Sequence, residues 1–206
     1  MTLARDVVSD GLIAELGRME ALVRSLSDEQ WNSPSRCAGW TVGDVARHAV
    51  GSVADATSGR LEGLGTPEAT QREVDERAGR TPTELADECA NVTRAGAAML
   101  SMFDDDAWEA PVGSGIAGTI GFGVEALWFD TFMHADDMRA SIGQAPDLTG
   151  GGIAGSVSHV EAHLADIGWN ESLPTDGQAA YDAVLVATGR ADASVLGAGA
   201  PPNIYA

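Results

Sequence analysis

The chain contains no lysine: its 12 basic side chains are all arginines, against 31 aspartates and glutamates. The resulting formal charge of −19 would repel a nucleic-acid backbone over most of the protein surface. An anionic membrane would be repelled for the same reason. We therefore expect neither nucleic acid nor a membrane as a partner.

Long apolar runs are also missing. The first twenty residues carry acidic side chains throughout, so they do not resemble a signal peptide. No later stretch approaches the ~18 to 20 consecutive apolar residues of a membrane-spanning helix. These two absences favour a cytoplasmic protein.

Cysteine is scarce, because Cys37 and Cys89 are the only two. They fit neither a disulfide framework nor a paired-cysteine metal knuckle. We interpret both as ordinary thiols.

What the chain does contain is helical periodicity. A length of 206 residues with 44% hydrophobic side chains suffices for one sizeable core, so we expect a single domain over residues 1–206, with its core in about 5–145 and an extension over about 150–206. Apolar residues recur at spacings of three and four, and capping patterns at Thr41 and Thr81 mark two helix starts. The predicted long helices cover about residues 6–26, 42–58, 82–102 and 124–142.

These four helices predict an all-α protein built as an antiparallel four-helix bundle. Residues 153–190 favour one or two short additional helices, and residues 189–206 a tail lying on the bundle. The glycine-rich segment 112–123 lacks a following Lys-Ser/Thr pair and a preceding βαβ pattern. We interpret it as a connection and not as a phosphate-binding loop.

The fourth predicted helix carries a candidate metal-binding pattern. Asp130 and His134 are four residues apart and lie on one face, with Asp137 on the next turn. A third ligand must come from another segment, and His48 on the second helix is the obvious candidate. Spacing alone also allows simpler interpretations: a hydrogen-bonded boundary histidine at 48, and a solvated face or helix ion pair at 130 and 134.

A second histidine pair competes with this one. His159 and His163 are also four residues apart, with Glu161 between them. The acid is not placed as in an HExxH zinc motif. The surrounding helix is short and mostly polar, which favours a solvated face.

Two stretches carry a resemblance to a known family. "LSDEQWNSPSRCAGWTVGDVARHAVG" resembles the signature of the mycothiol-dependent maleylpyruvate isomerase N-terminal family, a branch of the DinB-like four-helix-bundle proteins. In that signature a C-P-G-W-[ST]-V-x-D run precedes a metal-binding histidine. "DTFMHADDM" resembles the second signature, and the closing "NIYA" is similar to the ending of several members. The resemblance covers about residues 5–145.

The resemblance implies His48, Asp130 and His134 as ligands of a divalent metal, usually zinc, with Asp137 at the position of a supporting aspartate. It also implies mycothiol as the thiol cosubstrate. Ala38 replaces the usual proline, and Asp130 stands where glutamate or histidine is more common. The separate C-terminal domain of the full-length isomerase does not fit in the ~55 residues after the fourth helix, so that particular activity is not implied.

Three functions follow as hypotheses. The first is a metal-assisted, mycothiol-dependent isomerase or S-transferase that acts on a small electrophilic metabolite. The second is a metal-independent pocket protein or enzyme of a specialised-metabolite pathway. The third is a non-enzymatic, metal-binding regulatory bundle. The sequence fixes neither the substrate nor the oligomeric state, although a homodimer is compatible with it.

Overall fold

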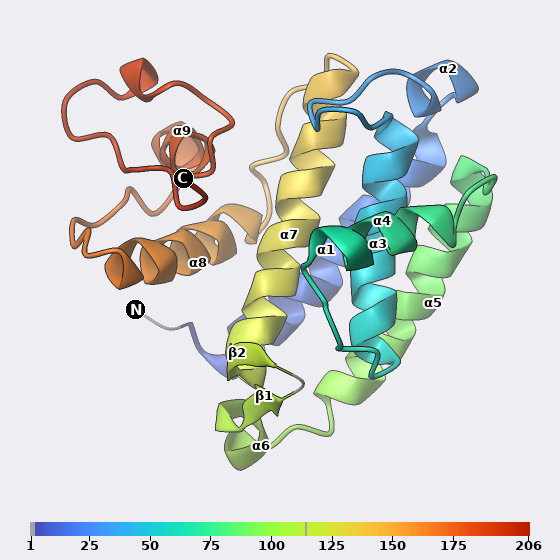
Figure 1. Ribbon diagram of the computed structural model, residues 1–206, viewed down its shortest axis with the longest axis horizontal. Helices are drawn as coiled ribbons and strands as arrows, with labels where there is room; N and C mark the ends of the chain where they lie inside the picture. The colour runs from blue at the N-terminus through green and yellow to red at the C-terminus, as the bar shows by residue number, and fades with distance from the viewer. Residues whose placement is uncertain (1–2, 114) are drawn as a thin grey trace.

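The computed structural model describes residues 3–113 and 115–206 and is dominated by helices (Figure 1). Within the described residues there are nine α-helices, one 3-10 turn and one small hairpin. The helices are α1 (Arg5–Ser25), α2 (Asp28–Trp31), α3 (Val42–Thr57), α4 (Pro67–Asp75), α5 (Pro82–Leu100), α6 (Asp105–Glu109), α7 (Ile120–Ser141), α8 (Gly152–Asp166) and α9 (Gly177–Ala187).

Four long helices form the bundle. Helix α1 packs against α5 and α7, and α3 packs against the same two helices. The all-α, DinB-like bundle predicted from the sequence is therefore confirmed. Within the described residues, no helix is both long enough and apolar enough to span a membrane.

The capping patterns define where two of these helices begin. The Thr41 side chain accepts a hydrogen bond from the Asp44 backbone N–H (3.1 Å), and the Asp44 carboxylate accepts one from the Thr41 N–H (3.0 Å). Thr81 and Glu84 repeat this reciprocal arrangement at α5, with Pro82 at the first helical position. Each pair satisfies backbone donors that a helix start leaves free.

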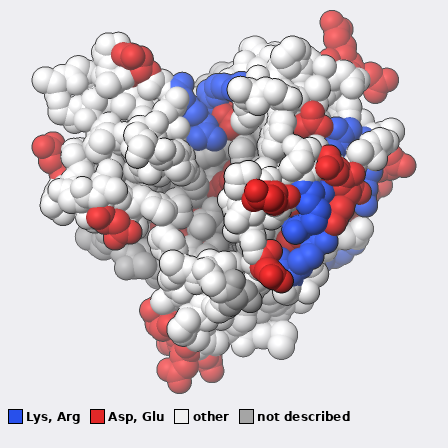
Figure 2. Space-filling model, in the orientation of Figure 1, with Lys and Arg blue, Asp and Glu red and all other residues white. Residues whose placement is uncertain are grey.

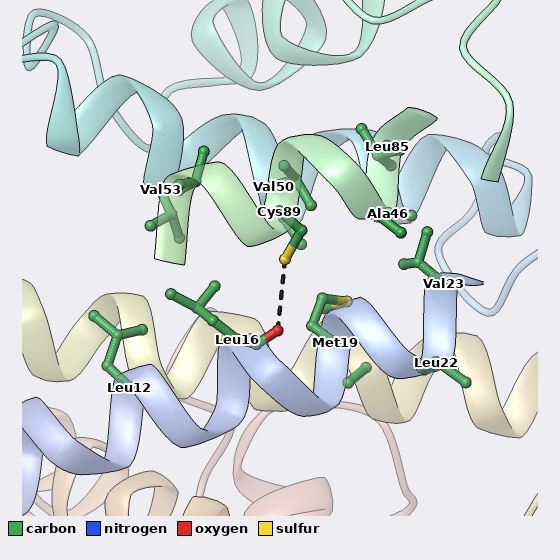
Figure 3. Close-up of a cluster of buried hydrophobic side chains, with 14 of the residues drawn as sticks. Leu12, Leu16, Met19, Leu22, Val23, Ala46, Val50, Val53, Leu85 and Cys89 are labelled. Atoms are coloured by element: carbon green, nitrogen blue, oxygen red, sulfur yellow. Dashed lines mark hydrogen bonds between the residues drawn. The ribbon is translucent and has the colours of Figure 1, made fainter. Parts of the chain in front are cut away.

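The bundle core is a cluster of aliphatic side chains between α1, α3 and α5 (Figure 3). Leu16 and Met19 of α1 face Val50 of α3 and Cys89 of α5. The Cys89 thiol donates to the Leu16 carbonyl oxygen at 3.5 Å. Burial raises the pKa of this thiol to about 12, so Cys89 is a core side chain without nucleophilic character.

The C-terminal extension packs on α7 through a second apolar cluster, to which α8 and α9 both contribute. Trp128 of α7 lies where α1 and α8 both come close. A Cβ atom on Gly11 or Gly155 would stand 2.3 Å or 2.6 Å from the indole ring. Glycine at these positions therefore lets three helices approach one tryptophan.

Two parts of the sequence interpretation are wrong. The segment predicted as a plain connection forms an antiparallel hairpin of β1 (Pro111–Gly113) and β2 (Ile116–Thr119), although Ser114 lies outside the described residues. Helix α7 then begins at Ile120, capped by Thr119, four residues before the expected start. The hairpin could not be recognised in this glycine-rich segment, because strands of three and four residues are too short to show an alternating pattern.

Helices α2 and α4 were not predicted either. Helix α4 lies in the stretch interpreted as a separator between the second and third long helices, and it begins with Thr66 as the cap and Pro67 as the first helical residue. It packs against α3. This places an additional helix beside His48.

Candidate metal centre

The turn before α3 fixes the position of His48. Gly39 has a φ of +85°, a conformation that favours glycine, and Pro34 pairs with Thr41 across the turn. The turn places the Trp40 ring 5.4 Å from the His48 ring, centroid to centroid. His48 therefore lies in the second turn of a capped helix, with its imidazole held against an indole.

Three side chains predicted as ligands meet between α3 and α7. The His48 Nε2 atom lies 3.8 Å from Asp130 Oδ2, and His134 Nε2 lies 3.2 Å from Asp130 Oδ1. The two imidazole rings are 4.9 Å apart, centroid to centroid, and nearly perpendicular. One ligand atom from each residue lies within 4.8 Å of the other two.

These separations fit a small divalent ion. Two ligands at 2.0–2.1 Å from a tetrahedral zinc stand roughly 3.3 Å apart. The two separations of 3.2 and 3.8 Å bracket that value. Three protein ligands leave a fourth position open, as in zinc sites that bind a substrate. The shorter arm of Asp130 therefore reaches both histidines.

Glu73 of α4 orients His48. Its Oε2 atom accepts a hydrogen bond from His48 Nδ1 at 2.7 Å, and the carboxylate is almost completely buried. Because a carboxylate only accepts, Nδ1 carries the proton and Nε2 keeps its lone pair for a metal. A histidine held in this way is typical of metal sites.

Glu73 was missed by the sequence analysis. The signal that could have found it is the Thr66-Pro67 pair, which is the same helix start that was recognised at Thr81-Pro82. It would have placed Glu73 on a helix, but not beside His48, because that contact spans 25 residues.

Asp137 plays the equivalent part for His134. Its Oδ2 accepts a hydrogen bond from His134 Nδ1 at 3.1 Å. Arg36, from the turn before α3, donates to Asp137 Oδ1 at 2.8 Å. Arg190, which follows α9, bonds both carboxylate oxygens at 3.0 and 2.9 Å. The C-terminal extension is thus tied to the aspartate that orients His134.

The pKa values of Asp130 and His134 favour a proton between them when no metal is bound. Burial alone would raise the pKa of Asp130, but the charges of His134 and His48 lower it well below its ordinary value. Burial alone would lower the pKa of His134, but the charge and hydrogen bond of Asp130 raise it well above its ordinary value. The proton on His134 Nε2 would therefore compete with a metal ion.

A second group of possible ligands shares His134 and consists of Cys37, His134 and Asp137. The Cys37 thiol donates to Asp137 Oδ2 at 3.4 Å. A dication bound there would stand beside the guanidinium groups of Arg36 and Arg190, which already neutralise Asp137. Charge repulsion therefore favours the site formed by His48, Asp130 and His134.

His159 of the second histidine pair is buried, so the expectation of a solvated face was wrong for this residue, whereas His163 is half-buried. His159 is only 5% exposed, and its ring stacks with Phe122 at 5.2 Å and with Phe129 at 4.6 Å, centroid to centroid. His163 meets it edge-on at 4.7 Å. Among the described residues no third ligand joins the two histidines. They form an aromatic cluster on the α8 side of α7.

The arrangement defines a helical-bundle protein with a three-residue candidate centre for a divalent metal. The family model of the mycothiol maleylpyruvate isomerase N-terminal domain matches residues 12–139, which is more than half of the 206 residues. The chain therefore belongs to this family. No curated protein and no solved structure matched it. The matched region contains all three candidate ligands and Glu73.

Proposed function

We propose that the protein is a metal-assisted, mycothiol-dependent isomerase or S-transferase that acts on a small electrophilic metabolite. The observation that carries the proposal is the convergence of one ligand atom each from His48, Asp130 and His134 within 4.8 Å. Membership of the family supports the link to mycothiol.

Each residue has a distinct part in the proposed site. His48, Asp130 and His134 hold the ion, while Glu73 and Asp137 each accept the Nδ1 proton of one histidine and so direct its Nε2 inward. Zinc matches the site, because it accepts a set of two nitrogens and one oxygen. A zinc ion held there would bind the mycothiol thiol and lower its pKa, which makes a thiolate available at neutral pH.

The open side of the centre determines what can react. The Asp130 side chain is 33% exposed, so the ligand cluster is accessible from outside the bundle. A thiolate held there can add to an electrophilic carbon. Elimination of the thiol after a bond rotation gives an isomerase, and retention of the new C–S bond gives an S-transferase.

The charge of the chain supports small-molecule chemistry. With a net charge of −19, the protein would repel nucleic acid and anionic membranes. Acidic side chains are spread over the face shown in Figure 2. We propose that it acts in the cytoplasm on a small electrophile and needs no macromolecular partner.

Cobalt substitution tests the proposal directly. Cobalt(II) takes the same ligands as zinc, and a bound thiolate gives it a charge-transfer band in the near ultraviolet. We expect mycothiol to produce this band in the cobalt-loaded wild-type protein. We expect no band in a His48→Gln variant, because the remaining two ligands lie on a single helix and bind metal more weakly.

A Cys37→Ser variant is the matched control, because Cys37 is the only other thiol near the centre. The band must persist in that variant if mycothiol supplies the sulfur. A band that vanishes with Cys37, or that appears before mycothiol is added, would mean that the protein's own thiol binds the metal. No band at all would refute a thiol at this centre.

A further inference from the structure

A hollow on the protein surface lies over α7, between α8 on one side and α4 on the other (Figures 1 and 2). The hairpin of β1 and β2 borders its lower end, and an acidic side chain is visible inside it. The candidate metal ligands occupy only part of the exposed face of α7. The remainder of that face has no role in the proposed function so far.

The exposed face of α7 is a narrow strip. From Gly121 to Arg139 every residue of the helix is buried except six, which are half-buried and lie on one side. They are Phe122, Gly123, Ala126, Leu127, Asp130 and His134. The last two belong to the candidate metal centre. We call Gly123, Ala126 and Leu127 the apolar strip, and Phe122 lies at its edge.

The apolar strip contains no charged and no hydrogen-bonding side chain. It begins one turn below Asp130 and reaches Gly123, which is about 10 Å away at 1.5 Å per residue. At Gly123 an added Cβ atom would meet only Val112 of the hairpin, at 3.4 Å. Because glycine and alanine have small side chains, little projects from the surface of α7 beside the metal centre.

Aromatic rings form the α8 side of the apolar strip. Phe122 lies 5.2 Å from His159 and 5.7 Å from His163, centroid to centroid. Burial and the neighbouring His163 lower the pKa of His159 to about 4, so its ring is neutral at physiological pH. His163 is half-buried and completes the wall. Rings at such separations favour another ring in offset or edge-on contact.

We propose that the apolar strip, walled by Phe122 and His163, binds an uncharged, planar, conjugated part of the electrophilic substrate. This inference rests on the proposed function, because it assumes that the reacting carbon lies next to the metal centre. The rise of about 10 Å from Gly123 to Asp130 accommodates one aromatic ring on the strip and a short conjugated carbonyl group beside the metal centre. A small dianion would find no cationic partner on the strip and would approach a protein of net charge −19.

Binding of acetophenone tests the inference without mycothiol or turnover. We expect acetophenone to shift the ring resonances of His163 in a carbon–proton NMR spectrum, and we expect maleate, an aliphatic dianion, to leave them unchanged. Ala126→Leu would fill the strip and weaken acetophenone binding at least about tenfold. Ala140→Leu makes the same change on an exposed position of α7 and should have no effect.

Metal content and circular dichroism of each variant show whether the centre and fold survive. If Ala126→Leu does not fold, Gly123→Ala replaces it, because its added Cβ meets only the Val112 side chain. Tighter binding of maleate than of acetophenone, or equal acetophenone binding by the Ala126→Leu and Ala140→Leu variants, would overturn the inference. A mycothiol band in cobalt-loaded protein that binds no acetophenone would refute the strip alone and leave the proposed function standing.

Discussion

Replacing Glu73 by glutamine should weaken metal binding without changing any ligand. Glu73 reaches His48 from α4, and its Oε2 accepts the Nδ1 proton at 2.7 Å. Glutamine keeps the size of the side chain, which matters because Gly51 of α3 packs closely against the Glu73 Cβ and Cγ atoms. It removes the negative charge that makes His48 a stronger ligand.

The size of the effect follows from the contact that is lost. Removing an outer hydrogen bond of a metal-binding histidine typically costs 10–100-fold in affinity. We expect about tenfold, or about 1.4 kcal/mol, for Glu73→Gln, because the amide oxygen still accepts the Nδ1 proton. Glu73→Ala should approach about 100-fold, since it leaves the buried Nδ1 donor without a partner.

Competition for zinc with a chromophoric chelator measures these affinities. Glu68→Gln is the matched control, because it removes the same charge from an exposed position of the same helix. It corrects for the general loss of negative charge. If Glu73→Gln and Glu68→Gln bound zinc equally well, the assignment of Glu73 as the group that orients His48 would be refuted.

Three further predictions concern pH and stability. Because the pKa of His134 is raised in the metal-free fold, a metal must displace the His134 proton. The apparent affinity for zinc should therefore rise by up to tenfold per pH unit from about pH 5 to 8. A flat pH profile in the chelator competition would contradict this. Without metal, the protonated form of His134 stabilises the fold at pH values below the ordinary histidine pKa. This stabilisation is lost as the pH rises through the raised pKa of His134. Leu16→Ala should lower the free energy of unfolding, measured with a chemical denaturant, by about 2–5 kcal/mol, because Leu16 is 1% exposed in the core. Val7→Ala on the same helix is the control: Val7 is 49% exposed, so its replacement should change stability by less than ~0.5 kcal/mol.

Periodicity was sufficient to predict the long helices, because apolar residues recur at spacings of three and four and two of the helices carry complete capping pairs. It was insufficient for α4, whose nine residues are mostly polar. That helix is held to α3 by an ion pair across 17 residues of sequence, in which the Asp55 carboxylate accepts a hydrogen bond from Arg72 of α4. The local sequence pattern does not predict such a pair.

The candidate centre could likewise be predicted from the sequence only in part. The spacing of Asp130, His134 and Asp137 places them on one face of a helix, and the structure brings His48 to that face from α3. Arg190 could not be predicted as a partner of Asp137, because 53 residues separate them. The burial of His159 was also hidden, since it depends on two phenylalanine rings of another helix.

Metal content of untagged protein, purified without chelator, tests the central claim most directly. Mass spectrometry of the wild-type protein after zinc addition should find about one zinc ion per chain, and His134→Ala should lose most of it. His163→Gln should retain the full amount, because its imidazole belongs to the aromatic wall and not to the ligand cluster. A wild-type protein that takes up no metal, or a His134→Ala variant that keeps it, would contradict the proposed centre.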